Sequence, residues 1–276
     1  MSTKDHQSEP IESASETLQR IFDGHGSVLG SQMADESSRY DVLKKTDFPK
    51  PQRTRRIAVA NQKGGVGKTT STVNTAAALA NKGAQVLVID MDPQGNASTA
   101  LGVSHASGEP SVYDVIEGRS DLGDVITVCP DFPTLDVVPA SIDLSGAELE
   151  VADLPNRNTL LKEALDLYLR QSDKHYDYVF IDCPPSLGLL VINAMCAVTE
   201  MLIPIQAEYY ALEGLSQLIH TIELVQERLN PELEIEGVVF TMYDARTNLS
   251  LQVVENVKDN LNQNIYKTII PRNVRL

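Results

Sequence analysis

The sequence predicts an α/β fold in which a doubly wound, mainly parallel sheet is covered by helices on both faces. From residue 56 onward, apolar β-favouring runs alternate with amphipathic helical patterns. The runs are almost continuously apolar, which is typical of parallel strands buried on both faces. The first run leads directly into a glycine-rich turn and a helix start, the local context of a phosphate-binding loop.

The composition suits one sizeable domain with an appendage. The chain has 276 residues, of which 42% are hydrophobic, and a formal net charge of −15 at pH 7. This charge argues against a protein that binds nucleic acid with its whole surface. From Thr241 onward, however, basic residues outnumber acidic ones, so a local basic face on an acidic body stays open.

The sequence contains no pattern typical of a membrane span, a signal peptide or a disulfide framework. No apolar run approaches the roughly 20 residues that span a bilayer, and the first ten residues do not resemble a signal peptide. Cys129, Cys183 and Cys196 lack C-x-x-C spacing and fit buried thiols in a reducing compartment. These observations predict a cytoplasmic protein that does not contact a membrane.

Residues 1–55 form a polar N-terminal extension that ends in a proline-containing linker and a basic cluster. Such a composition cannot bury enough apolar surface to fold alone, so we expect this segment to be disordered. Within it, Ile11–Phe22 carries apolar residues at helical spacing. This stretch is either a transient helix that docks on a partner or part of the disordered tail.

The remaining elements follow from runs of branched apolar residues for strands and from apolar residues at helical spacing for helices. The predicted strands are Ile57–Asn61, Val86–Asp90, Leu135–Pro139, Tyr178–Asp182, Met201–Gln206, Gly237–Met242 and Ile265–Ile270. Helices are expected at Ser71–Ala80, Asn158–Arg170, Leu187–Ala197, Ala211–Leu229 and Leu249–Leu261. Ligands of parallel sheets bind at the carboxyl ends of strands, so residues just after strands are the functional candidates.

The glycine-rich turn after the first strand is the strongest candidate site. Its residues are Lys63, Gly64, Gly65, Val66, Gly67, Lys68, Thr69 and Thr70. Glycines leave backbone N–H groups free to face phosphates, and the helix N-terminus adds positive potential. Lys68 would reach the β- and γ-phosphates and the Thr69 hydroxyl would ligate Mg²⁺. The alternative is a strand-to-helix turn without a ligand.

This turn departs from the usual G-x-x-x-x-G-K-S/T pattern in two ways. Gln62 stands where the first glycine would fall, and Lys63 adds a second lysine inside the loop. A second cation adds repulsion unless more negative charge has to be covered.

Aspartates end two of the predicted strands. Asp90 and Asp92 follow V-L-V-I, and a carboxylate there, next to a γ-phosphate, could orient the attacking water. Asp182 ends the run Y-V-F-I and would hold Mg²⁺ through a bound water. The alternative is that Asp90 only ends its strand and Asp92 starts a turn. Cys183, beside Asp182, is interpreted as a packing residue.

The motifs K-G-G-V-G-K-T and D-x-D-P-Q-G-N resemble those of the ParA/MinD family of dimerising ATPases, which have a deviant Walker A loop. The resemblance implies a P-loop ATPase domain over residues 56–276 with ATP and Mg²⁺ as cofactors. It implies that Lys63 crosses a dimer interface to the partner's nucleotide, while Lys68 is the ordinary loop lysine. It also implies that Asp92 activates water and that Asp90 supports the Mg²⁺ environment. Relatives continue beyond the position of Leu276, so a truncation of the domain there stays open.

Two segments near the C-terminus, residues 241–248 and 270–275, resemble segments of chromosomal ParA proteins of the Soj type. The resemblance implies that Met242 and Pro271 lie next to the adenine. It also implies that Arg246 and Arg275, and with them Arg272, contact the DNA backbone without reading its sequence. Solvated loop arginines are the alternative.

Together, the resemblance implies an ATP-dependent dimerising switch that binds double-stranded DNA non-specifically, is associated with the nucleoid, and partitions chromosomes or plasmids with a ParB-type partner. Asp92 can position water but cannot neutralise charge on the transferred phosphoryl group, so slow, partner-stimulated hydrolysis is expected. An orphan ParA-like ATPase that positions the division site or other cargo is the alternative within the family. A metabolic P-loop ligase or kinase and a purely structural DNA-binding protein are alternatives of other classes.

Overall fold

The computed structural model describes residues 38, 40, 42, 48–208, 211–244, 253, 257 and 263–272, with the backbone alone for 211–213. The chain divides into two units, Met1–Pro49 and Lys50–Leu276, and the fold below is that of the second unit. The predicted helix Ile11–Phe22 lies outside the described residues. Of the predicted helix Leu249–Leu261, the described residues are Val253 and Val257, which are helical and buried. The disordered extension over residues 1–55 stays a prediction.

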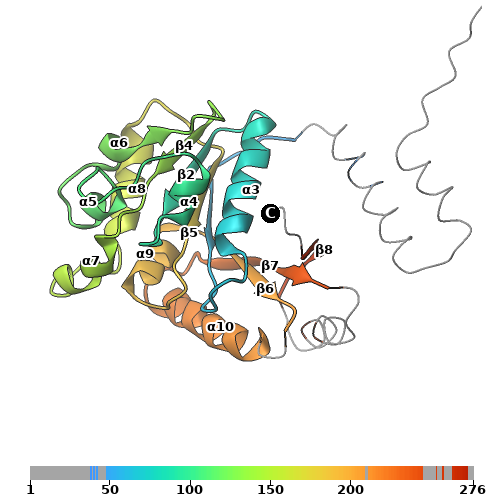
Figure 1. Cartoon of the computed structure of the whole chain (residues 1–276). Coiled ribbons are helices and arrows are strands. Elements are labelled where there is room, and N and C mark those ends of the chain that lie inside the picture. Colours follow the sequence, from blue (N-terminus) through green and yellow to red (C-terminus); the bar gives the residue numbers. More distant parts are fainter. Residues whose placement is uncertain are drawn as a thin grey trace, which may run out of the picture. The chain divides into compact units, whose positions relative to one another are not determined.

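A single eight-stranded sheet runs through the second unit (Figure 1). Its strands are β1 Arg55–Val59, β2 Val86–Asp90, β3 Thr127–Val128, β4 Leu135–Val138, β5 Tyr178–Asp182, β6 Glu200–Gln206, β7 Glu234–Tyr243 and β8 Ile265–Pro271. The spatial order is β3-β4-β2-β5-β1-β6-β7-β8. Every neighbouring pair is parallel except β3 with β4.

All seven predicted strands are present, and the predicted doubly wound, mainly parallel sheet is confirmed. The eighth strand, β3, was not predicted. It contains two exposed residues and pairs antiparallel to β4 at the edge of the sheet. A strand of this length has no periodicity from which a sequence pattern could be read.

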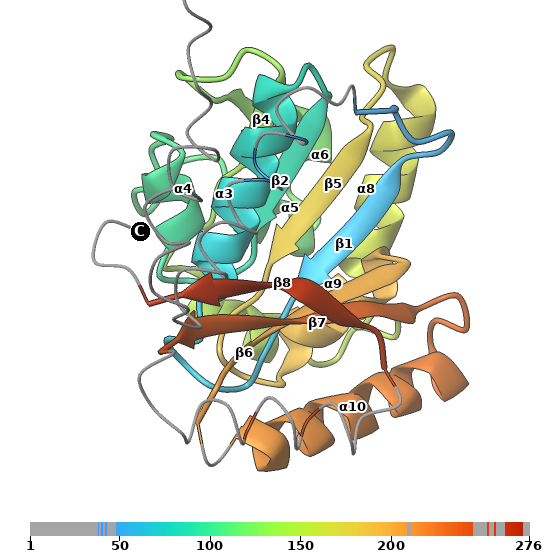
Figure 2. The ribbon, with the colours of Figure 1, turned by 90° about the vertical axis from the view of Figure 1, so that its right-hand side faces the viewer.

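The described helices cover both faces of the sheet (Figure 2). They are α3 Lys68–Asn81, α4 Asn96–Ala100, α5 Val112–Ile116, α6 Leu122–Val125, α7 Leu144–Glu150, α8 Leu160–Gln171, α9 Leu189–Ala197 and α10 Ala211–Arg228. The short helices α4 to α7 were not predicted. None of the helices in the described part of the chain is long and apolar enough to cross a membrane.

Alternating residues of the central strands build two separate apolar cores. In β1, Ile57 and Val59 pack in one cluster with Ala76 and Ala80 of α3. Ala58 belongs to the other cluster, which contains buried residues of α5 to α10. Because side chains of a strand point to opposite faces in turn, this alternation explains why all five residues of β2 are buried.

The carboxyl ends of the seven parallel strands meet at one edge of the sheet. Strand β1 lies between β5 and β6. The connection through α3 leads from β1 to β2 on one side of it, and the connection through α10 leads from β6 to β7 on the other side. Ligands of open α/β sheets bind at such a topological switch point. The fold therefore places the glycine-rich turn, which follows β1, at the expected ligand position.

Candidate functional site

The turn between β1 and α3 has the backbone of an anion-binding loop. Gly65 (φ 74°) and Gly67 (φ 87°) adopt the left-handed conformation that favours glycine. Gly67 directly precedes α3, and its carbonyl oxygen accepts a hydrogen bond from the N–H of Ser71 at 2.9 Å. Gly64 and Gly65 are exposed. The loop therefore presents open backbone in front of a helix N-terminus, where an anion is stabilised.

Two buried polar side chains hold this loop against the sheet. Asn61 donates from Nδ2 to the carbonyl oxygen of Pro204 at 2.8 Å and accepts from the N–H of Lys63 at 3.0 Å. Thr241, near the end of β7, donates from Oγ1 to the carbonyl oxygen of Val66 at 2.7 Å. The sequence did not indicate these two hydrogen bonds, because Asn61 and Pro204 are 143 positions apart in the chain and Val66 and Thr241 are 175 apart.

The two loop lysines lie in different environments. Lys68 is buried, and its Nζ lies 3.3 Å from the carbonyl oxygen of Lys63. Burial lowers the pKa of Lys68, and the charges of Asp182 and Asp92 act in the opposite direction. Lys63 is half-buried and forms an ion pair with Glu208, which follows β6. Lys68 thus belongs to the interior of the site, whereas Lys63 is at its surface and is held by a carboxylate of its own subunit.

Thr69 and Asp182 form the pair that would hold a magnesium ion. Thr69 Oγ1 donates to Asp182 Oδ2 at 2.7 Å, and Thr72 Oγ1 lies 3.0 Å from Asp182 Oδ1. Asp182 is fully buried, and this burial raises its pKa to about 7; the hydroxyl hydrogen bonds oppose the shift and the charge of Asp90 adds to it. A hydroxyl and a buried carboxylate next to the phosphate loop fit Mg²⁺, which keeps water and phosphate oxygens among its ligands.

No cluster of three or more His, Cys, Asp or Glu side chains within the described ranges could hold a metal ion by itself. A cation at Thr69 and Asp182 would therefore depend on a phosphate-bearing ligand to complete its coordination. This dependence is the usual one for Mg²⁺ in nucleotide sites.

Asp90 has both oxygens engaged by the turn that follows it. Oδ1 accepts from the N–H of Asp92 at 3.1 Å, and Oδ2 accepts from the N–H and Oγ of Ser98 at 2.8 and 2.7 Å. Burial raises the pKa of Asp90, and the Ser98 hydrogen bonds oppose this shift. Asp90 thus shapes the turn that carries Asp92, and its predicted support of the Mg²⁺ environment stays a prediction.

Asp92 lies in that turn, 7% exposed, and its Oδ1 accepts from the N–H of Gln94 at 3.0 Å. Its charge acts on Lys68 and on Asp182, so the structure brings the three predicted side chains into one electrostatic neighbourhood. To orient water at a γ-phosphate, Asp92 has to lie close to Lys68 and Asp182, as it does here. The role itself stays a prediction.

Met242 and Pro271 lie at the carboxyl ends of the neighbouring strands β7 and β8. Tyr243 is paired with Pro271, and the N–H of Arg272 donates to the carbonyl oxygen of Tyr243 at 3.0 Å. Both strands end at the edge that carries the phosphate loop, and Pro271 and Arg272 are exposed. Their adenine and DNA contacts stay predictions. Arg246 and Arg275 lie outside the described residues.

The cysteines show no sign of chemistry. All three are buried and unpaired, as predicted. Burial raises the pKa of Cys183 strongly, so this thiol stays protonated despite its position beside Asp182. The interpretation of Cys183 as a packing residue agrees with this environment.

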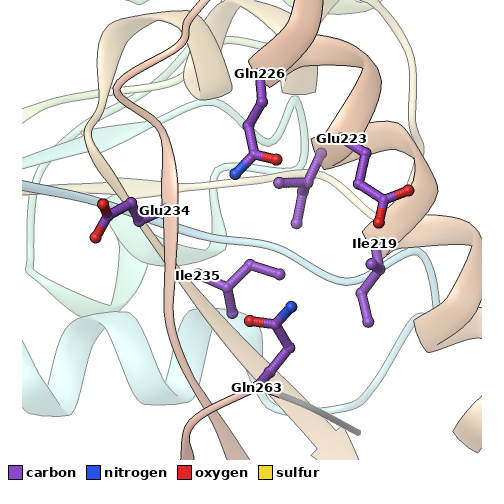
Figure 3. A pocket seen from close by; sticks show the side chains of 7 residues that line it. Ile219, Glu223, Gln226, Glu234, Ile235 and Gln263 are labelled. Carbon is purple, nitrogen blue, oxygen red and sulfur yellow. The ribbon is translucent and has the colours of Figure 1, made fainter.

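A cavity of about 310 Å³ lies between α10 and the amino end of β7 (Figure 3). It is lined by Ile219, Ile222, Glu223, Gln226, Glu234, Ile235 and Gln263. No predicted site residue is among them, and Glu234 and Ile235 start β7 at the end of the sheet opposite to the phosphate loop. The cavity is therefore separate from the candidate site.

Comparisons with known proteins assign this arrangement to a family. A family model described as an AAA domain matches residues 54–235. The sporulation initiation inhibitor protein Soj of Bacillus subtilis is 54% identical over 220 residues, which cover 80% of this chain and 85% of Soj. The chain belongs to the Soj/ParA family of chromosome-partitioning ATPases. The chromosome partitioning protein ParA of Caulobacter vibrioides is 49% identical over 80% of this chain and 81% of its own length.

Solved structures agree on the fold of this Soj/ParA chain. Cobyrinic acid a,c-diamide synthase from Mycobacterium smegmatis, with bound ADP and magnesium, superposes with a TM-score of 0.73 at 38% identity, covering 80% of this chain and 87% of that one. A second structure of the same enzyme holds an ATP analogue and magnesium. An ATP complex of a Cyanothece McdA variant has a TM-score of 0.71 at 22% identity, over 78% of this chain and 83% of that one.

Replacing Asp182 with Asn tests the metal pair. The change removes a fully buried negative charge but keeps an oxygen that can accept from Thr69. We expect the affinity for the nucleotide in the presence of Mg²⁺ to fall by about 10- to 100-fold, the usual effect of disturbing a metal site, and to become independent of Mg²⁺. Because an unneutralised buried carboxylate disfavours folding, the nucleotide-free variant should unfold at a higher temperature. Nucleotide titrations with Mg²⁺ or EDTA, and thermal unfolding, measure the two effects.

Thr69→Ser keeps the hydroxyl and is the matched control, with a retained response to Mg²⁺. If the Asp182→Asn variant responded to Mg²⁺ as the natural chain does, Asp182 would have no part in holding the metal.

Proposed function

We propose that this chain is an ATP-dependent dimerising switch that binds double-stranded DNA without sequence preference and serves chromosome or plasmid partitioning with a ParB-type partner. The observation that carries the proposal is the second loop lysine, Lys63. It is half-exposed in a loop whose other lysine, Lys68, already lies inside the site. A cation placed at the surface of a phosphate loop has a use when a second nucleotide approaches from outside.

Different residues of one subunit bind the phosphates of ATP, hold Mg²⁺ and position the attacking water. The open backbone at Gly64 to Gly67 and the ammonium group of Lys68 hold the phosphates. Thr69 and Asp182 hold Mg²⁺, which supplies charge neutralisation on the phosphate oxygens when it is bound. Asp92 accepts a hydrogen bond from the water that attacks the γ-phosphate and positions it.

Hydrolysis by a single subunit is slow in this scheme because the outer phosphate lacks a further cation. Lys63, the candidate for that role, is paired with Glu208 of its own subunit. The two side chains are 41% and 45% exposed, and exposed ion pairs are typically worth about 0.2–1 kcal/mol. A triphosphate of the partner subunit can therefore replace Glu208 as the counter-charge of Lys63 at little expense.

Dimerisation would also create the DNA-binding surface. Arg272 lies exposed at the carboxyl edge, and Arg246 and Arg275 belong to segments outside the described residues. With a net charge of −15, a single subunit attracts DNA weakly. Two or three arginine contacts from each of two subunits would neutralise about 4–6 phosphates and give a slope of about −4 to −5 in log affinity against log salt.

Two other functions remain as alternatives, and both can be tested. An orphan positioning ATPase would share every property above except the ParB-type partner. The cobyrinic acid a,c-diamide synthase named among the solved structures favours a metabolic role instead. Stimulation of ATP hydrolysis by DNA, and further by a partner peptide, would support partitioning. Hydrolysis that responds only to a small-molecule acid would support the metabolic alternative.

Nucleotide state should decide DNA affinity. We expect a random-sequence duplex to be bound at least about tenfold more tightly with ATP than with ADP, because the arginine faces of two subunits then act together. Fluorescence anisotropy over a range of salt concentrations measures both the affinity and the slope. Equal affinity with ATP and ADP would contradict the switch.

The Asp92→Asn variant should stay in the ATP-bound state that binds DNA. Asn keeps an oxygen for the N–H of Gln94, so the turn is preserved, but it cannot position water as a carboxylate does. We expect ATP hydrolysis to fall by about 100-fold or more, the usual contribution of a general base, and the variant to stay on DNA with ATP. Normal hydrolysis by this variant would remove Asp92 from the mechanism.

Gly64→Val tests the approach of two subunits. In the single chain, a Cβ at Gly64 meets no atom within 4 Å, so the variant should fold. The added branch would stand on the exposed surface of the loop and obstruct a second nucleotide face. We expect sedimentation to show a monomer with ATP under conditions in which the natural chain dimerises. Gly64→Ala, with one added carbon, is the graded control, and unaltered dimerisation of the valine variant counts against the model.

A further inference from the structure

Thr241 lies directly beneath the phosphate loop, although it belongs to a strand on the far side of β6. It is 3% exposed, and its Oγ1 lies 2.7 Å from the carbonyl oxygen of Val66. A Cβ at Gly67 would lie 3.7 Å from Thr241 Cγ2, so the threonine also packs against the residue that starts α3. Any displacement of the loop therefore acts on the end of β7.

The Thr241 hydroxyl has a second acceptor within reach. The carbonyl oxygen of Ile205, on β6, lies 3.2 Å from Oγ1. A hydroxyl has a single proton to donate, so only one carbonyl can receive a full hydrogen bond at a time. Rotation about the Cβ–Oγ1 bond is sufficient to move the proton from the loop to the strand. The contact therefore has two discrete arrangements, with the loop either tied to β7 or released from it.

The residue after Thr241 has an unusual backbone. Met242 has φ 49°, the one positive φ among the non-glycine residues that the structure describes. Residues other than glycine, asparagine, aspartate and histidine rarely adopt this left-handed backbone conformation, and such a conformation is held by the surrounding structure. Met242 is flanked by Thr241, which is bound to the loop, and by Tyr243, which is bound to Arg272.

These contacts connect the phosphate loop to the junction of β7 and β8. The carbonyl oxygen of Tyr243 accepts from the N–H of Arg272 at 3.0 Å, and Tyr243 pairs with Pro271. Thr241 thus binds the loop, Met242 turns the backbone, and Tyr243 binds the exposed end of β8. The link is short, and each end is fixed by a hydrogen bond.

We propose that Thr241 is a positioning residue that couples the phosphate loop to the Tyr243–Arg272 junction through the left-handed backbone of Met242. Filling the loop with nucleotide phosphates changes the position of the Val66 carbonyl, and the Thr241 hydroxyl conveys this change to β7. The consequence for DNA rests on the proposed function, because Arg272 is there a DNA contact. The coupling itself requires only that a nucleotide binds the loop.

The Thr241→Val variant removes the hydroxyl and keeps the shape of the side chain, whereas Thr241→Ser keeps the hydroxyl. Hydrogen exchange of the amides in residues 264–272 is measured without ligand and with a phosphate-only analogue of ATP, inorganic tripolyphosphate, at concentrations that saturate each protein. This analogue fills the loop but lacks the adenine that Met242 and Pro271 are predicted to contact. In the natural chain and in Thr241→Ser we expect the analogue to change this exchange. In Thr241→Val the change should disappear although the analogue is bound.

DNA affinity provides the second measurement. Coupling between two sites is typically worth 5- to 150-fold, so we expect the ratio of affinities with ATP and with ADP to fall at least about fivefold in Thr241→Val. Thr241→Ser should restore the ratio. If the natural chain bound DNA equally with ATP and ADP, the proposed function would fail, and the exchange experiment would still decide the coupling.

A natural chain whose exchange does not respond to the analogue would overturn the proposal, and so would either of two results with Thr241→Val. The first is an exchange response in Thr241→Val equal to that of the natural chain. The second is loss of analogue binding in Thr241→Val, because Thr241 would then only support the loop. Should Thr241→Val fail to fold, Met242→Gly decides the question. It relaxes the left-handed backbone and should weaken the exchange response at saturating analogue, and an unchanged response would refute the coupling.

Discussion

The site is organised around a carboxylate that is kept out of water. Asp182 is fully buried, and its partner in the register of β2 and β5 is Asp90, which is fully buried as well. Two threonine hydroxyls donate to Asp182, whereas a serine hydroxyl and two backbone N–H groups donate to Asp90. The charge of Lys68 also interacts with that of Asp182. The raised pKa of Asp182 shows that these contacts do not fully offset burial. A cation at this position would complete the balance, so a carboxylate that disfavours folding has a use in binding.

The loop at this edge of the sheet contains two lysines, one inside the site and one at its surface. Lys68 is buried and interacts with the charges of Asp182 and Asp92, whereas Lys63 makes a surface ion pair that a stronger anion can replace. This difference separates binding from activation. In the proposed function, one subunit holds a nucleotide by itself, and a second subunit adds a cation at the outer face of the loop.

Sequence reasoning captured the features that repeat or that stand next to one another in the chain. The central strands were predictable because they are almost continuously apolar, and Asp92 and Asp182 because they lie at or just after the ends of such strands. The contacts that shape the site join residues far apart. Lys63 and Glu208 are 145 positions apart, and Val66 and Thr241 are 175 apart. The carboxylate of Asp90 also accepts from Asp92 and Ser98, in the turn that follows it, rather than from the phosphate loop, which only the folded turn reveals.

The central claim is that two copies of the chain close over two ATP molecules and that this closed pair is the form that holds DNA. Its most direct test is the mass of the complex formed on a short DNA duplex with saturating ATP and Mg²⁺, measured by sedimentation or light scattering. The account predicts two chains for each bound duplex and almost no complex with ADP. A single chain that stays monomeric with ATP and still binds the duplex tightly would contradict it.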